Sequence, residues 1–496
     1  MAAIGIVIIV LYVLVMMGIG YWSMKRTKSV GDFFLGNRSI GPWMSAFAYG
    51  TTYFSAVLFI GYAGNLGWGF GIHTMWIVVG NAIVGCLLAW RILGSRTRTM
   101  TARLNCMTMP DFLAVRFNNK SLRIISATIV FVFLVPYSAS VYTGLSYLVG
   151  TYFNIPYQYA LGFMALLTGV YLMMGGYIAL TITDFIRGII ELFGVLIMVY
   201  FLASQVGGFG QATHNLLKPV NAPGLFMPAK PGCPPGWITL WSLVIVTSFG
   251  PWGLPQMVQK FYSIKSKAYI KSTMIVCTIF SLLMAFGAYY SGAMTHLFAV
   301  KDPAIMGVAK TNIDNLMPTL LARHTPAAIS IVIIVLVFSA SMSSLSSIVL
   351  VSSSAIVMDL YAGAIKPNAS KNNIMALMRV LCGVFVAASL LIALKRPMFI
   401  VDLMALAWGA LAGSFAAPYV YGLFWRKTTS AGAVAGMCVG LGLVVVFYIC
   451  KGQPWIPASG ALAVLVPFIV VPVVSLFTKQ LPKDVIARAF SDGKEP

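Results

Sequence analysis

Long apolar runs recur from one end of the chain to the other, and the charged residues gather in the short segments between them. A run of about 20 apolar residues is long enough to cross a ~30 Å hydrocarbon core as a helix. The pattern therefore predicts an all-α polytopic membrane protein with about 13 transmembrane helices. The expected spans are residues 3–22, 40–62, 70–94, 124–150, 157–176, 178–204, 236–258, 271–298, 325–362, 373–394, 398–424, 429–450 and 456–477.

Composition and charge support this prediction. The chain is 59% hydrophobic and only 9% charged, whereas soluble domains carry roughly 25% charge. A net charge of +22 would suggest nucleic acid in a soluble protein, but about 24 of the 33 Lys and Arg, four of them in 260–271, fall in segments expected on the inner side. This bias predicts a plasma-membrane protein with its N-terminus outside and its C-terminus inside, facing lipid rather than nucleic acid. Arg187 is the basic residue expected at membrane depth.

Several chemistries are excluded by missing motifs. The seven Cys and four His are scattered without metal-ligand spacing, and Cys233, in the outer segment "KPGCPPGW", is expected to be a free exposed thiol. Neither a phosphate-binding GxxxxGK[ST] loop nor a GxGxxG fingerprint occurs. No nucleophile, base and orienting group converge in a readable motif, so the protein is not expected to be an enzyme.

Two spans contain residues that interrupt a helix. The second holds "AYGTTYFSA" at 48–56, where Gly50 precedes a Thr-Thr-Tyr cluster, and the seventh holds "SFGPWGLP" at 248–255, with two Gly and two Pro. Secondary transporters bind ions and solutes at paired interruptions of this kind. The breaks are five spans apart, which predicts an inverted five-plus-five helix repeat with broken helices 2 and 7. The alternative is that Gly and Pro only kink packed helices.

Hydroxyl side chains crowd the ninth span at "FSASMSSLSS", residues 338–347. At helical spacing Ser343, Ser346 and Ser347 share a face, while Ser344 points about 100° away. Hydroxyls and open carbonyls suit sodium, because they supply oxygen ligands without burying a permanent charge. The two directions could serve two neighbouring sites. The alternative is close helix packing, with the hydroxyls bonded back to carbonyls of the preceding turn.

Asp184, Arg187 and Glu191 lie deep in the sixth span within "TITDFIRGIIE". Spacings of three and four residues allow both acids to contact the guanidinium, so a buried neutralising cluster is one interpretation. The other makes Asp184 a cation ligand, held or gated by Arg187.

Three stretches resemble the sodium/solute symporter family, which has the broken-helix fold of leucine-type transporters. They are "GGYIALTITDFIRG" at 175–188, "SASMSSLSSIVLVSSSAIVMDLY" at 339–361 and "GSFAAPYVYGLFWRKTTSAGAVAG" at 413–436, joined by the segment 51–64. The resemblance covers most of the chain and implies sodium as the co-transported ion. The implied first sodium site uses the carbonyls of Thr51, Phe54 and Ala340 and the hydroxyls of Ser343 and Ser344.

A second sodium site occurs in some members of that family. The matching positions here are Asp184, Ser343, Ser346 and Ser347, which favours two sodium ions per solute. Where the family usually has Gln three residues after the aspartate, this chain has Arg187. A fixed positive charge there competes with a second ion.

The resemblance also implies a single transporter domain. Residues 39–204 and 236–424 would form the two repeats, and residues 1–38 and 425–496 the peripheral helices and tail. A small organic solute should lie beside the breaks, under hydroxyl and aromatic side chains. The candidates for solute binding are Tyr53, Ser55, Tyr137, Trp252 and Trp408.

The expected function is sodium-coupled import of a small organic solute by alternating access. The sequence looks nearest to the proline and pantothenate branches of the family. The alternatives are uptake of a monocarboxylate or a sugar with one sodium ion and, from another class, a solute-gated channel or a transporter-like sensor. The sequence does not indicate an oligomeric state.

Overall fold

The computed structural model describes residues 2–26, 30–174, 176–366 and 369–490, and most of the chain within them is helical. Elements labelled η are 3₁₀- or π-helical segments. The first half contains α1 (Ala2–Arg26), α2 (Val30–Leu35), α3 (Pro42–Tyr53), η2 (Val57–Tyr62), α4 (Ala63–Phe70), α5 (Met75–Gly80), η4 (Asn81–Leu88), η5 (Trp90–Gly94), α6 (Ser95–Arg103), α7 (Met109–Arg116), α8 (Lys120–Phe153), α9 (Tyr157–Met174), α10 (Tyr177–Gln205), α11 (Gly208–Leu216) and α12 (Pro223–Phe226). The second half contains α13 (Gly236–Gly253), α14 (Pro255–Ser263), α15 (Ile270–Ala293), α16 (Thr295–Ala299), α17 (Pro303–Thr311), α18 (Leu316–His324), α19 (Ala327–Ser354), η9 (Ala355–Ile365), α20 (Lys371–Lys395), α21 (Ile400–Phe424), α22 (Ser430–Lys451), α23 (Ile456–Leu465), α24 (Pro467–Phe477) and α25 (Lys483–Phe490).

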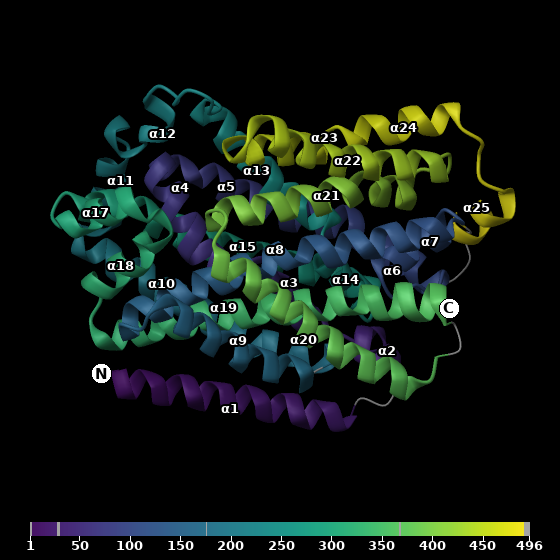
Figure 1. Ribbon diagram of the computed structural model, residues 1–496, viewed down its shortest axis with the longest axis horizontal. Helices are drawn as coiled ribbons and strands as arrows, with labels where there is room; N and C mark the ends of the chain where they lie inside the picture. Colours follow the sequence, from purple (N-terminus) through teal and green to yellow (C-terminus); the bar gives the residue numbers. More distant parts are fainter. Residues whose placement is uncertain (1, 27–29, 175, 367–368, 491–496) are drawn as a thin grey trace.

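The long helices run roughly side by side along the longest axis of the molecule (Figure 1). Among the described residues nine helices are long and apolar enough to span a membrane, or ten if the bent pair α13 and α14 is one span. The all-α membrane fold is therefore confirmed, while the count of 13 spans and the five-plus-five repeat stay predictions. Helix α1 begins at one end of the bundle and α25 lies at the other (Figure 1).

Helix α19 lies at the centre of the bundle. Every residue from Leu336 to Ser354 is buried, so all faces of this stretch contact protein. Its serines consequently point at neighbouring helices, whereas a lipid-facing serine would leave a hydroxyl in hydrocarbon. Helices α10 and α8 and the short α3 pack around it.

Both expected helix breaks are present. Helix α3 ends at Tyr53, Phe54 is extended with φ −112° and ψ 131°, and helical geometry resumes after Ser55. In the seventh predicted span α13 ends at Gly253 and Leu254 is extended. Helix α14 then leaves at an angle of 44° to α13. Pro255 favours this interruption, since its ring cannot continue the hydrogen-bond ladder of the preceding helix.

The helix beyond the first break is held by a backbone-to-backbone contact. A Cβ built on Gly292 of α15 would lie 2.0 Å from the carbonyl oxygen of Ala63, and one on Gly67 would lie 2.3 Å from the carbonyl carbon of Gly292. Helices α4 and α15 can approach this closely because both positions are glycine.

We expect Gly292→Ala to destabilise the protein by about 1–3 kcal/mol, because the added methyl group must push α4 away. The measurement is the apparent melting temperature of the purified protein. Gly383→Ala on α20 is the matched control, since a Cβ there meets nothing within 4 Å. Equal melting temperatures for the two variants would contradict the close contact.

Candidate ion and solute site

The break after α3 directs three backbone carbonyls at one serine. The Oγ of Ser344 lies 3.4 Å from the carbonyl oxygen of Thr51, 3.2 Å from that of Thr52 and 3.3 Å from that of Phe54. The last carbonyls of a helix have no partner within that helix. One hydroxyl donates only one hydrogen bond. The three oxygens therefore keep acceptor capacity that a small cation can use.

Ser343 connects this carbonyl cluster to a buried acid. Its Oγ lies 2.8 Å from the Oγ1 of Thr51 and 2.7 Å from the Oδ1 of Asp184. Ala340, one turn before Ser344, is also buried on α19. The five residues expected at the first sodium site thus come from the break and from the adjoining face of α19. Thr52, whose carbonyl also faces Ser344, was not predicted from the sequence.

Asp184 lies between two basic side chains. Its Oδ1 is 3.6 Å from a terminal nitrogen of Arg187, and its Oδ2 is 3.8 Å from the Nζ of Lys260 on α14. All three side chains are at most 1% exposed. The assignment of Lys260 to an inner basic segment is therefore wrong. The seventh predicted span ended at 258, whereas the helix after the break continues to Ser263 and carries Lys260 into the protein interior.

The other two serines of the second predicted site differ in their contacts. The Oγ of Ser347 lies 3.0 Å from the Oγ1 of Thr52 and 3.3 Å from the Nζ of Lys260. Ser346 donates to the carbonyl of Met342 at 2.6 Å, the back-bonding considered as the alternative for this cluster. The structure thus brings Asp184, Ser343 and Ser347 together, and Lys260 with them.

A narrow cavity lined by aromatic and hydroxyl side chains adjoins the first break. Buried side chains in it offer polar atoms: the Oδ1 of Asn81 and the hydroxyl of Tyr62 have no hydrogen-bond partner within the described residues. Its lining residues are Tyr53, Phe54, Ser55, Leu58, Tyr62, Asn81, Thr247, Tyr289, Met404 and Trp408.

The five residues predicted to bind solute lie at different distances from this cavity. Tyr53, Ser55 and Trp408 line it. Tyr137 lies behind Trp408, with an edge-to-face contact of 5.8 Å between ring centroids. Trp252 lies outside the lining and donates its indole N–H to the carbonyl of Val84 at 3.0 Å. Sequence reasoning missed Asn81 and Thr247, because single polar residues in apolar helices give no pattern that marks a cavity.

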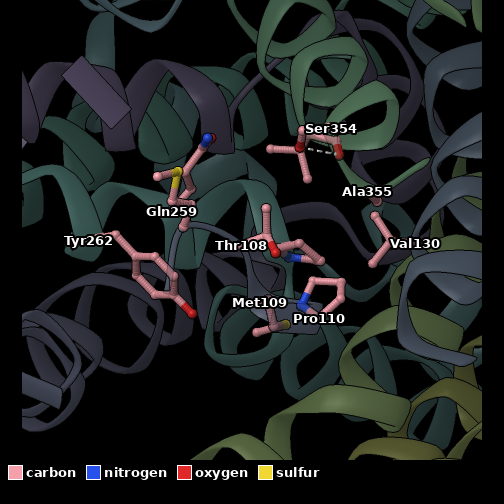
Figure 2. A pocket seen from close by; sticks show the side chains of 11 residues that line it. Thr108, Met109, Pro110, Val130, Gln259, Tyr262, Ser354 and Ala355 are labelled. Carbon is pink, nitrogen blue, oxygen red and sulfur yellow. Dashed lines mark hydrogen bonds between the residues drawn. The ribbon is translucent and has the colours of Figure 1, made fainter. Parts of the chain in front are cut away.

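A second cavity lies nearer the end of the bundle that carries α6 and α7. Figure 2 shows Gln259 and Tyr262 of α14 on one side of it and Ser354 and Ala355 on the other. Thr108 and its neighbours lie between them (Figure 2). This cavity therefore lies along α14 and the last turn of α19, beyond the cluster formed by Asp184, Lys260 and Ser347.

Polar contacts join the elements beside this cavity. Thr108 donates to the Oδ1 of Asp359 at 2.7 Å, and Arg123 forms an ion pair with Asp111. Burial raises the pKa of the Asp111 carboxyl, and the charge of Arg123 opposes that rise. These contacts join α7 to η9 and α8.

The sequence of the chain matches the profile of the Sodium:solute symporter family over residues 33–440. The chain belongs to this family. The match spans both helix breaks, the serine cluster and Asp184, so the resemblance noted in the sequence is confirmed. The protein is a sodium-coupled symporter of a small organic solute and not an enzyme.

Named relatives agree with the family. The osmoregulated proline transporter OpuE of Bacillus subtilis (strain 168) is 28% identical over 452 residues, which cover 88% of this chain and 87% of that protein. The high-affinity proline transporter PutP of the same organism is 30% identical over 444 residues, covering 87% and 89%. The sodium/proline symporter of Escherichia coli (strain K12) is 27% identical over 444 residues, covering 88% and 86%.

Solved structures share the fold. A Na+-coupled sialic acid symporter superposes with a TM-score of 0.79 at 19% identity, covering 97% of this chain and 99% of that one. Mhp1, a nucleobase-cation-symport-1 family transporter, gives a TM-score of 0.54 at 14% identity, covering 92% and 97%. The broken-helix fold of leucine-type transporters, inferred from the sequence, is confirmed.

We expect Ser344→Ala to weaken sodium binding about tenfold, because losing one oxygen ligand costs roughly 1–3 kcal/mol. The measurement is the rise in melting temperature of the purified protein as sodium chloride replaces choline chloride. Ser341→Ala is the matched control, since Ser341 bonds only back to the carbonyl of Val337 on the same helix. If both variants respond to sodium as the wild type does, Ser344 is not a ligand.

Proposed function

We propose that the protein imports L-proline together with one sodium ion bound at the first predicted site. The proline-transporting relatives support this solute. The sodium ligands in the proposal are the carbonyls of Thr51, Phe54 and Ala340 and the hydroxyls of Ser343 and Ser344. The observation that carries it is the convergence of the carbonyls of Thr51, Thr52 and Phe54 on Ser344.

The ion and the solute share one structural element in this proposal. The carbonyl of Phe54 faces the ion position, and Phe54 and Ser55 line the solute cavity. The helical segment that begins at Val57 directs its N-terminal end at the same place, where a solute carboxylate is stabilised by the helix dipole. Sodium orders the break and so favours solute binding, and linkage requires the solute to favour sodium by the same factor.

The electrical driving force of one ion is sufficient for uptake. A cation moving inward gains ~2.3 kcal/mol per 100 mV, so one sodium ion at roughly 150 mV supplies about 3.5 kcal/mol. That free energy supports an accumulation ratio of about 300-fold before any sodium concentration gradient is added. A stoichiometry of one sodium ion per solute is therefore sufficient for accumulating the solute.

We expect proteoliposomes containing the purified protein to accumulate radiolabelled L-proline when sodium is outside and a negative potential is set inside. Replacing sodium with potassium or choline should lower the initial rate of proline uptake at least tenfold, because the site at the break after α3 then holds no sodium ion. Asn81→Ala should raise the KM for proline by removing a polar atom of the cavity.

Competition separates the alternatives. Excess pantothenate, lactate, glucose or sialic acid should leave proline uptake unchanged. If one of these compounds is taken up with sodium and proline is not, that compound is the solute. The conclusion that transport is coupled to sodium would still hold. Flux that rises linearly with solute concentration would instead indicate a channel.

We also propose that the protein lies in the plasma membrane with its N-terminus outside and its C-terminus inside. The inner excess of Lys and Arg supports this orientation, and α1 begins at the end of the bundle opposite to α25 (Figure 1). Cys233, a partly exposed free thiol in the loop before α13, then lies outside.

A membrane-impermeant maleimide should therefore label Cys233 on intact cells. The labelling is done in a Cys450→Ser background, since Cys450 is an exposed thiol at the end of α22. Cys233→Ser in that background is the control and should abolish the signal. Labelling that requires permeabilised cells would reverse the orientation.

A further inference from the structure

Lys260 lies where a cation between Asp184 and Ser347 would lie. Its Nζ is 3.8 Å from the Oδ2 of Asp184 and 3.3 Å from the Oγ of Ser347, which are two of the four oxygens predicted to hold a second sodium ion. The same Nζ lies 5.2 Å from the ring centroid of Tyr177, close enough for a cation–π contact. An oxygen ligand, a carboxylate and an aromatic face thus surround the ammonium group.

The remaining predicted ligands of that second site are engaged elsewhere. Ser343 lies within hydrogen-bond distance of the Oδ1 of Asp184 and the Oγ1 of Thr51, so it belongs to the cluster at the break. Ser346 donates to Met342 within its own helix. Occupying a second sodium site would require at least Ser346 to turn and Lys260 to withdraw.

The cluster already holds its own cations. Asp184 lies between two bases, Arg187 and Lys260, and all three side chains are buried. Arg187 is held further by its Nε, which donates to the hydroxyl of Tyr12 on α1 at 3.1 Å. Adding sodium would leave an excess positive charge in a low-dielectric interior, which is costly unless a base leaves.

We propose that the ammonium group of Lys260 takes the place of a second sodium ion, so that each transport cycle carries one. Lys260 is a positioning residue: it joins α14, beyond the second break, to Asp184 on α10 and Ser347 on α19. Through Ser347 and Thr52 it also contacts the helix that ends at the first break. A tethered cation thereby connects the two broken spans, a task that a mobile ion would otherwise perform.

The proposal deepens the proposed function, because it rests on a first sodium ion at Ser344 and fixes the number of ions carried. The test counts bound ions directly. Purified protein is equilibrated with radioactive sodium without any solute, and the bound ions per protein are measured at saturation. We expect one ion for the wild type and still one for Asp184→Asn, since neither needs a second site.

Lys260→Gln removes the ammonium and leaves Asp184 facing Ser347, so the count should rise to two. Adding Asp184→Asn to this variant should return it to one. Lys271→Gln, which removes an exposed lysine on α15, is the matched control and should bind one.

Each outcome has one meaning. Two ions bound to the wild type would overturn the proposal and leave the symport intact, and this count stands even if Lys260→Gln fails to fold. A folded Lys260→Gln protein that still binds one ion would also overturn it, because removing the ammonium would then open no site. A wild type that binds no sodium would instead overturn the first site and with it the proposed function.

Discussion

The structure depends on how the interrupted backbone between α3 and η2 is satisfied. A helix break in an apolar environment is costly, because its carbonyls lose both the helix and water as partners. Here three such carbonyls converge on the single hydroxyl of Ser344. One proton cannot satisfy three acceptors. The break is therefore stabilised most fully when a cation joins the hydroxyl, and this shortage of donors is what makes the site select an ion.

The Asp184 cluster presents the opposite case, in which the chain supplies its own cations. A sodium ion about 4 Å from the Lys260 ammonium would be repelled by about 4 kcal/mol at an effective dielectric constant of ~20. At ~1.4 kcal/mol per factor of ten, this repulsion would weaken the binding of a second ion about a thousandfold while Lys260 stays in place. Removing the lysine would change the affinity of this position for a cation more than any exchange of neutral ligands would.

Sequence reasoning found the features that have strong local signatures. Two Gly and two Pro in eight residues mark the second break, four serines within five residues mark α19, and an acid in an apolar span marks Asp184. Lys260 was missed because its local pattern is that of an ordinary basic inner segment. Its burial depends on where α14 goes after Leu254, and a bend of 44° cannot be read from residue types. Asn81 and Thr247 were missed for a similar reason, since the cavity exists only where six separate elements meet.

The position of Lys260 on α14 also couples the contacts of Asp184 to the second cavity. Gln259, its neighbour in sequence, lines that cavity together with Tyr262 and with Ser354 at the end of α19 (Figure 2). A shift of α14 away from α10 and α19 would carry the ammonium away from Asp184 and Ser347. Such a shift would remove one of the two bases beside the buried Asp184, which is unfavourable. The ion pair would therefore resist opening on this side, and Ser343 connects the same aspartate to the first predicted sodium site.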